Sequence, residues 1–402
     1  MKERKQSQMV SWPHFEKDEI AAVVRVLKSG KVNYWTGSEG RLFEKEFASF
    51  VGCRYAVALT NGTMALETAL RSLGIGPGDD VIVPSRTFIA SASCVVMCGA
   101  RPIMADVDSV SQNITVDTLK AVLTSRTRAI IAVHLAGWPC DMNPIMAFAR
   151  QRGLKVIEDC AQALGASYQG RPVGSLGHVA AFSFCQDKIL TTGGEGGMLT
   201  TNDQAVWKKA WSYKDHGKRY RISSGLKFFP RFQWLHDSFG TNGRMTEMQS
   251  AIGRVQLRKV HGWVRKRRAH AEILASYFKN IPAFCITIPT IETGHSFYKY
   301  YVFLRLEKLK KGWSRARILR GMNQKGVFCS VGSCGEIYLE KAFRNKNLGP
   351  VRRFPVARKL AETSLMFLIH PTLPGRHFRR VGKVVMEIMS RASVPAEVKN
   401  GR

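Results

Sequence analysis

The stretch FSFCQDKILTTGGEGG, residues 182–197, joins an apolar strand to a glycine-rich loop and places Asp187 and Lys188 between them. A lysine in this position is either a salt-bridged surface residue or a desolvated amine that can attack a carbonyl group. Ser183 can bond to a phosphate, and the glycine loop allows close packing around a flat ligand. The stretch alone leaves both interpretations of Lys188 open.

The flanking sequence predicts an α/β fold with a mostly parallel central sheet flanked by helices. Short apolar runs of strand type alternate with helical patterns such as 63–74 and 143–153, each of which ends in glycine. The expected strands are 54–60, 79–85, 101–108, 128–137, 154–161, 179–185 and 196–202.

The C-terminal part of the chain has a different pattern. Residues 246–281 are expected to form one long helix, and 297–306 are the clearest strand of a smaller α+β portion. We therefore expect two domains: a large α/β domain at 1–250 and a small C-terminal α+β domain at 251–402.

The first of two further motifs is an anion site after the strand at 54–60. Asn61, Gly62 and Thr63 open a helix there, so free backbone N–H groups and the helix dipole favour a phosphate, and Gly62 allows its close approach. The alternative is an ordinary helix N-cap with no ligand.

The second motif is KVIEDCAQALGASYQG, residues 155–170, which brings two acidic residues to the end of a strand. Open α/β sheets bind ligands at this edge. Strand alternation puts Glu158 and Asp159 on opposite faces, and we expect Asp159 to meet the ligand, with Gln162 adding a hydrogen bond. Otherwise Asp159 is a helix cap.

Together the three motifs match the needs of pyridoxal 5'-phosphate. This cofactor requires a lysine for its aldehyde, an anion site for its phosphate, and a carboxylate that keeps its ring nitrogen protonated. We therefore predict an enzyme that binds it, with Lys188 and Asp159 as catalytic residues.

The chain also resembles the DegT/DnrJ/StrS family of sugar aminotransferases, which are fold-type I pyridoxal-phosphate enzymes, from about residue 12 to 390. The resemblance rests on GTMAL (62–66), PSRTF (84–88), VIEDCAQALGA (156–166), the stretch 182–197 and TNGRMTEMQSAIGRVQL (241–257). It implies a transaminase.

The resemblance also implies a role for each matching residue. Lys188 holds the cofactor and shuttles a proton, Asp159 pairs with the ring nitrogen, and Gln162 lies near the phenolic oxygen. The residues assigned to the phosphate are Gly62, Thr63 and Ser183. Phe88 stacks on the ring, unless it is a plain core residue.

Two further residues are assigned to contacts beyond the cofactor ring. Asn242 is expected to reach the phosphate of a neighbouring subunit, which implies a homodimer with shared active sites. Arg244 is expected to contact the amino donor or the substrate.

Departures from the family pattern concern substrate contacts. The family often has histidine at Cys185 and Leu164 and an aromatic residue at Gly243. Relatives that dehydrate sugars carry histidine at the position of Lys188, so the lysine favours amination.

Composition narrows the class of protein and its location. The net charge is +31, and residues 251–402 hold 31 Lys+Arg against 8 Asp+Glu. This charge suits a phosphate-bearing substrate, nucleic acid, an anionic membrane face or a basic solvated surface of no specific use. The nine cysteines lack a CxxC pair, so we expect reduced thiols and no metal site.

No membrane span or secretion signal is found, which predicts a cytoplasmic protein.

The expected reaction is transfer of an amino group from an amino acid, with glutamate as first candidate, to a nucleotide-linked keto-deoxysugar. Its products are expected to serve surface polysaccharide such as lipopolysaccharide. One alternative is amination of a cyclitol or another non-nucleotide ketone. The other is a basic nucleic-acid-binding protein with a vestigial pyridoxal site. We expect no nucleic-acid partner, because residues 1–11 leave no room for the DNA-binding domain that such regulators carry.

Overall fold

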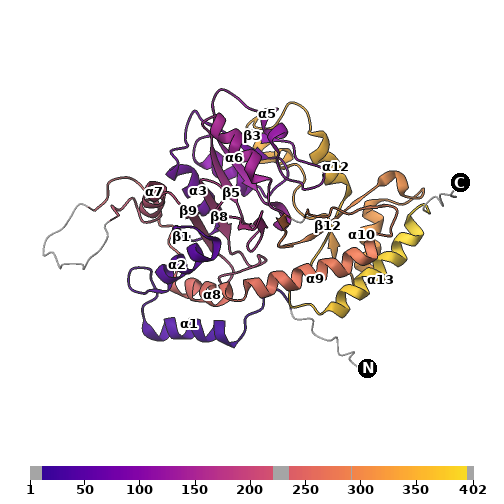
Figure 1. Cartoon of the computed structure of the whole chain (residues 1–402), viewed down its shortest axis with the longest axis horizontal. Coiled ribbons are helices and arrows are strands. Elements are labelled where there is room, and N and C mark those ends of the chain that lie inside the picture. The colour runs from indigo at the N-terminus through magenta and orange to yellow at the C-terminus, as the bar shows by residue number, and fades with distance from the viewer. Residues whose placement is uncertain (1–10, 221–234, 291, 396–402) are drawn as a thin grey trace.

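A seven-stranded sheet forms the centre of the computed structural model, which describes residues 11–220, 235–290 and 292–395 (Figure 1). The strands lie in the order β1-β9-β8-β5-β4-β2-β3, and β9 runs antiparallel to both of its neighbours while the other pairings are parallel. All seven predicted strands are present: β1 (Tyr55–Leu59), β2 (Asp80–Pro84), β3 (Arg101–Ala105), β4 (Thr127–Val133), β5 (Lys155–Asp159), β8 (Val179–Ser183) and β9 (Gly197–Thr201).

Helices cover both faces of this sheet because the strands are apolar on both sides. Aromatic residues of α2 (Glu39–Val51) and α6 (Met142–Gln151) pack on one face. Aliphatic residues of α3 (Gly62–Ser72), α4 (Ala90–Met97) and α7 (Gln204–Lys214) pack on the other. The two predicted helices at 63–74 and 143–153 are thus confirmed as α3 and α6.

The prediction of one helix at 246–281 was wrong in detail. The structure has α8 (Glu247–Leu257) and α9 (Val260–Phe278), separated by a turn at Arg258 and Lys259. The amide of Lys259 donates to the carbonyl of Gln256, three residues back, so the backbone tightens there. The Lys259 amine is held by Glu16, Asp18 and Glu19 at the N-terminus of α1 (Lys17–Ser29), an attachment that local periodicity does not encode.

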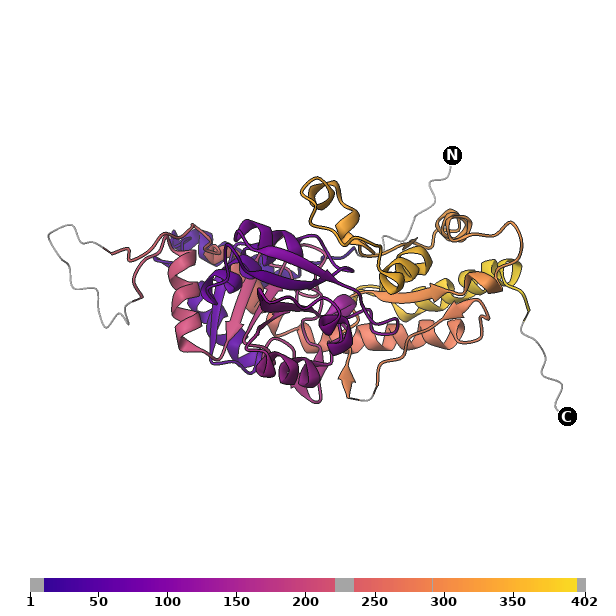
Figure 2. The same ribbon diagram turned by 90° about the horizontal axis from the view of Figure 1, so that it is seen from above.

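The C-terminal portion has its own antiparallel sheet and core, and it lies beside the large sheet along the long axis of the molecule (Figure 2). Its strand order is β10 (Phe284–Cys285), β12 (Tyr300–Leu304), β14 (Ser364–Phe367) and β13 (Cys329–Ser330), and the predicted strand at 297–306 is β12. Helices α9, α10 (Arg315–Gln324) and α13 (Gly375–Ala392) contribute to its core.

Short elements complete the described part of the chain. A three-stranded sheet joins β11 (Thr293–Gly294), β6 (Ser167–Tyr168) and β7 (Arg171–Pro172). The remaining helices are α5 (Val116–Lys120), α11 (Lys341–Arg344), α12 (Pro355–Thr363), and the 3-10 turns η1 (Leu135–Gly137), η2 (Leu306–Lys308) and η3 (Ile337–Leu339).

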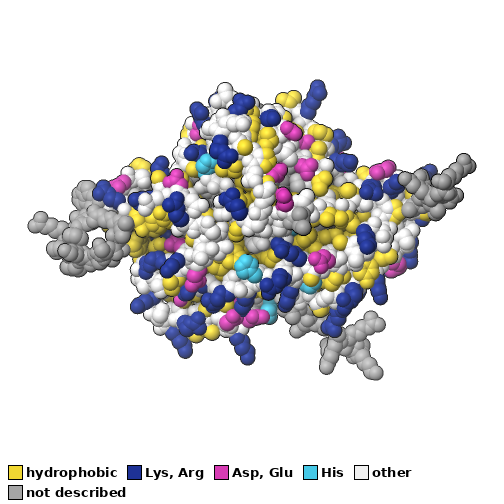
Figure 3. All heavy atoms as spheres, viewed as in Figure 1, with side chains coloured by type: hydrophobic (Ala, Val, Ile, Leu, Met, Phe, Trp, Pro, Cys, Tyr) yellow, Lys and Arg dark blue, Asp and Glu magenta, His cyan; other side chains and the backbone are white. Residues whose placement is uncertain are grey.

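Basic side chains are spread over the visible face of the molecule and are not gathered in one patch (Figure 3). Within the described residues, no helix is both long and apolar enough to cross a bilayer.

Candidate active site

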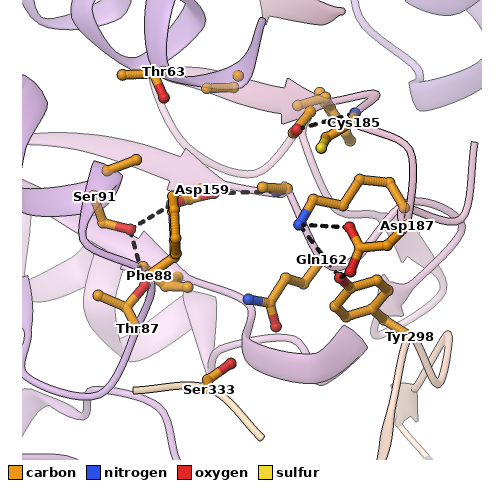
Figure 4. A pocket seen from close by; sticks show the side chains of 18 of the residues that line it. Thr63, Thr87, Phe88, Ser91, Asp159, Gln162, Cys185, Asp187, Tyr298 and Ser333 are labelled. Carbon is orange, nitrogen blue, oxygen red and sulfur yellow. Dashed lines mark hydrogen bonds and ion pairs between the residues drawn. The ribbon is translucent and has the colours of Figure 1, made fainter. Parts of the chain in front are cut away.

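A cavity of about 620 Å³ lies where the carboxyl ends of the parallel strands face the C-terminal portion. Residues from the loops after β1 and β2 and from the ends of β5 and β8 line one side. Residues 298, 299, 301 and 332–334 line the other. Figure 4 shows Asp159 and Asp187 on opposite sides of this space, with Gln162 between them. The cavity lies at the sheet edge where the sequence predicts a ligand.

Lys188 lines this cavity with a side chain that is 18% exposed. Its Nζ lies 3.4 Å from the hydroxyl of Tyr298 and 3.7 Å from Oδ1 of Asp187. Its own carbonyl accepts a hydrogen bond of 2.8 Å from Trp12 Nε1, which fixes the backbone at this position. Lys188 is therefore a mostly buried lysine in the cavity wall and not a surface lysine, while its attack on a carbonyl group stays a prediction.

Asp159 is 5% exposed and also lines the cavity. Its Oδ2 accepts from the Ser91 hydroxyl at 2.7 Å, and its Oδ1 accepts from the Ala161 amide at 3.1 Å. Burial raises the pKa of Asp159, because these two bonds and the more distant charge of Lys188 only partly replace lost water. A buried carboxylate of this kind is stabilised by a cationic or proton-donating ligand group.

Glu158 points to the opposite face of β5, as strand alternation predicts. It is fully buried and accepts hydrogen bonds from the amides of Gly174, Leu176 and Gly177, at 2.7 to 2.9 Å. Nε2 of His134 lies 2.9 Å from it, and Nδ1 of the same ring accepts from the Cys140 amide. Glu158 therefore holds a loop in place and stays away from the cavity.

The N-terminus of α3 and the end of β8 meet at the cavity, where the sequence predicts an anion site. Asn61 caps the helix by accepting from the Met64 amide at 2.8 Å, while Gly62, Thr63 and Ser183 line the cavity beside it. A Cβ added at Gly62 would lie 2.6 Å from the Cβ of Ser183. Only glycine allows the helix start to approach this serine so closely, which brings the start of α3 and the Ser183 hydroxyl to the same part of the cavity wall.

Gln162 and Phe88 also line the cavity. The side-chain oxygen of Gln162 accepts a hydrogen bond of 2.9 Å from the Ala136 amide, which leaves the side-chain NH₂ group to donate towards a ligand. Phe88 is 64% exposed, which excludes the alternative of a plain core phenylalanine in this chain.

Asn242 and Arg244 lie outside the cavity of their own chain. Asn242 is exposed and pairs through its backbone with Asp215. Arg244 forms an ion pair with the same Asp215. A contact of either residue with a second subunit, or of Arg244 with a substrate, stays a prediction.

The three departures from the family pattern have different surroundings. Cys185 lines the cavity, whereas Leu164 is buried in the core beneath the sheet. Gly243 is buried, and a Cβ there would meet Met64 and Leu59 at 3.4 and 3.5 Å.

Several cavity residues were not predicted from sequence. Ser91 and Thr87 form a hydroxyl chain to Asp159, and Tyr298 donates to Asp187. Lys299 also faces Asp187, at 3.5 Å. Ser91 lies in the first turn of α4, three positions after Phe88, which precedes the helix, and no pattern in the sequence singled it out. No local pattern brings residues 298 and 299 next to 187, since over 100 positions separate them.

A mostly parallel seven-stranded sheet with a lysine after β8, an aspartate at the end of β5 and a glycine-serine anion cradle defines the class of fold-type I aminotransferases.

Comparisons with known proteins identify the family within this class. The model of the DegT/DnrJ/EryC1/StrS aminotransferase family matches residues 13–386, so the chain belongs to this family and is a transaminase.

The relatives cover the chain to different extents. A GDP-perosamine synthase of Caulobacter vibrioides is 48% identical over 229 residues, which are 56% of this chain and 59% of that enzyme. A UDP-N-acetyl-3-dehydro-alpha-D-glucosamine 3-aminotransferase of Acidithiobacillus ferrooxidans is 34% identical over 87% of this chain and 88% of that enzyme. The solved structure of an aminotransferase from Psychrobacter cryohalolentis superposes with a TM-score of 0.92 at 51% identity, covering 94% and 98% of the two chains.

Proposed function

We propose that this chain binds pyridoxal 5'-phosphate and transfers an amino group from an amino acid to a nucleotide-linked keto-deoxysugar. Glutamate is the first candidate donor. The single observation that carries the proposal is that Lys188 and Asp159 line one cavity, together with the cradle of Gly62, Thr63 and Ser183. The relatives named as GDP- and UDP-sugar enzymes support the substrate class, and surface polysaccharide is the proposed use of the product.

The surroundings of the cavity fit this cofactor on two counts. The close approach of Gly62 to Ser183 leaves helix N–H groups and hydroxyls for a phosphate. The buried Asp159 carboxylate accepts just two hydrogen bonds among those identified, so it has capacity left for a ring N–H. When bound, the cofactor supplies an aldehyde for the incoming amine and a ring that accepts electrons.

Each residue then has a defined task. Lys188 would hold the cofactor through Nζ and would act as the base that carries a proton away from the α-carbon of the donor. Asp159, oriented by the Ser91 hydroxyl, would keep a proton on the ring nitrogen. Gln162 would donate to the phenolic oxygen, and Phe88 would cover the ring face.

The active unit is proposed to be a cytoplasmic homodimer in which Asn242 reaches the partner subunit's phosphate site. The division into domains at 1–250 and 251–402 is likewise retained as a proposal. Amination of a cyclitol remains the second candidate reaction, since the cavity residues do not distinguish one ring ketone from another.

The cofactor assignment is tested by borohydride reduction of the purified protein followed by peptide mapping. The label is expected on Lys188, and Lys188→Ala is expected to lose the visible absorbance of the cofactor. An alanine variant that remains coloured and reducible would disprove the assignment. The substrate class is tested with a panel of GDP-, UDP- and dTDP-linked ketosugars and glutamate, and failure of all of them would favour the cyclitol.

A further inference from the structure

Lys299 is a second cationic side chain in the cavity. Among the described residues that line it, Lys188 and Lys299 are the lysines, and no arginine lines it. Lys188 is committed to the cofactor in the proposed function. Lys299 lies directly before β12, and its side chain is 16% exposed. A substrate anion that enters this cavity therefore meets Lys299 as its available cation.

A single carboxylate joins the two amines. Asp187 places Oδ1 3.7 Å from Nζ of Lys188 and Oδ2 3.5 Å from Nζ of Lys299. Both distances exceed the 2.7–2.9 Å or so of a strong charge-assisted hydrogen bond. The hydroxyl of Tyr298 also donates to this carboxylate. Lys299 is thus held in place by Asp187 without being fully neutralised by it.

Two buried guanidinium groups make this side of the cavity more positive. Arg267 donates to the carbonyl of Tyr298 at 3.1 Å, just behind Lys299. Arg86 is fully buried, 5.7 Å from the Tyr301 ring centre, and neither of its terminal nitrogens has a hydrogen-bond partner among the described residues. An anion beside Tyr298 and Tyr301 would be stabilised by these charges.

Distance from Lys188 decides which substrate anion fits. The α-carboxylate of an amino acid is bonded to the carbon that carries the reacting amine, so it stays beside Lys188. The diphosphate of a nucleotide sugar is separated from most ring carbons by further bonds of the sugar. Asp187 itself demonstrates that one carboxylate can lie between the amines of Lys188 and Lys299.

The geometry points to Lys299 as the residue that binds the α-carboxylate of the amino-acid donor, with Asp187 and Tyr298 positioning its amine. This assignment rests on the proposed transamination. It gives two of the three acidic residues that line the cavity separate tasks: Asp159 serves the cofactor, and Asp187 presents Lys299 to the donor.

The test uses the cofactor-loaded protein and follows the donor half-reaction by the loss of visible absorbance. Common L-amino acids are screened first, and the best donor is compared with its decarboxylated amine, which for glutamate is 4-aminobutyrate. Lys299→Gln is expected to weaken apparent donor affinity roughly 10- to 100-fold, because a hydrogen-bonded charge is lost. Its reaction with the decarboxylated amine should change less than about twofold.

Two matched variants complete the design. Lys299→Arg keeps the charge and should restore part of the affinity, whereas Lys346→Gln removes an exposed charge of the same portion and should behave as wild type. The acceptor half-reaction, started from the amine form of the cofactor with a ketosugar, should be nearly unaffected by Lys299→Gln. If Lys299→Gln binds the donor normally, or loses both amines and the ketosugar equally, the assignment is overturned. If no amino acid bleaches the wild-type protein, the proposed function itself has failed.

Discussion

Replacing Gly62 by alanine tests whether the anion cradle depends on contact between the start of α3 and the end of β8. The new Cβ would lie 2.6 Å from Cβ and 3.1 Å from Cα of Ser183. Carbon atoms in contact prefer about 3.5–4.0 Å, so the two elements must separate by about 1 Å. Overpacking of this kind costs roughly 1–3 kcal/mol.

The same displacement should weaken cofactor binding. Moving the helix start away from Ser183 removes one hydrogen bond to the phosphate, and a bond to a charged group contributes about 1.5–3 kcal/mol. We therefore expect Gly62→Ala to bind pyridoxal phosphate roughly 10- to 100-fold more weakly. The assays are fluorescence titration with the cofactor and the thermal midpoint of the cofactor-free protein.

Two further variants distinguish the effect of the steric clash at Gly62 from the effect of any glycine-to-alanine change in a helix. Gly262 lies in α9 with no atom within 4 Å of an added Cβ, so Gly262→Ala should be neutral or stabilising by up to about 1 kcal/mol. Ser183→Gly in the Gly62→Ala background removes the 2.6 Å contact and leaves the milder 3.1 Å contact with Cα, so it should restore part of the midpoint, while the affinity stays low because the hydroxyl is gone. A Gly62→Ala protein with wild-type affinity and midpoint would refute the proposed contact.

Three other predictions follow from the site. Asp159→Asn should lower cofactor affinity at least tenfold or so, yet leave the cofactor-free protein at pH 8 as stable as wild type or more so in urea. The direction of this stability change follows from the raised pKa of Asp159. A carboxyl group whose pKa is higher in the folded protein than in the unfolded chain destabilises the folded protein as pH rises above the unfolded pKa. A clear loss of stability in Asp159→Asn would argue against this reasoning. Glu158 behaves oppositely: burial opposes its charge, but His134 and the loop amides lower its pKa, so its stabilisation is present above the unfolded value and is lost as pH falls through the folded one. Glu158→Ala should cost roughly 3–5 kcal/mol at pH 7, and urea midpoints that coincide for the variant and the wild type at pH 7 would contradict this. Finally, mixing unfolded Lys188→Ala and Asn242→Ala chains and refolding them should recover about a quarter of wild-type donor turnover if active sites are shared between two subunits; no recovery would indicate that Asn242 serves its own chain.

Prediction of the fold from sequence succeeded where the signal is local. Each of the seven strands is a short apolar run, and glycines such as Gly74 and Gly153 end helices with positive φ as expected. The break between α8 and α9 was missed, because Lys259 is held by acidic residues about 240 positions away.

The sequence by itself determined one wall of the cavity, which includes Lys188, Asp159, Gln162 and Gly62. These groups lie at strand ends and helix starts, whose positions follow from periodicity and from the shared edge of parallel strands. Only the tertiary structure decided the opposite wall, where Tyr298 and Lys299 meet Asp187. That contact joins the loop after β8 to the residues just before β12, and the packing between the two sheets is a property of the whole chain that no short stretch encodes.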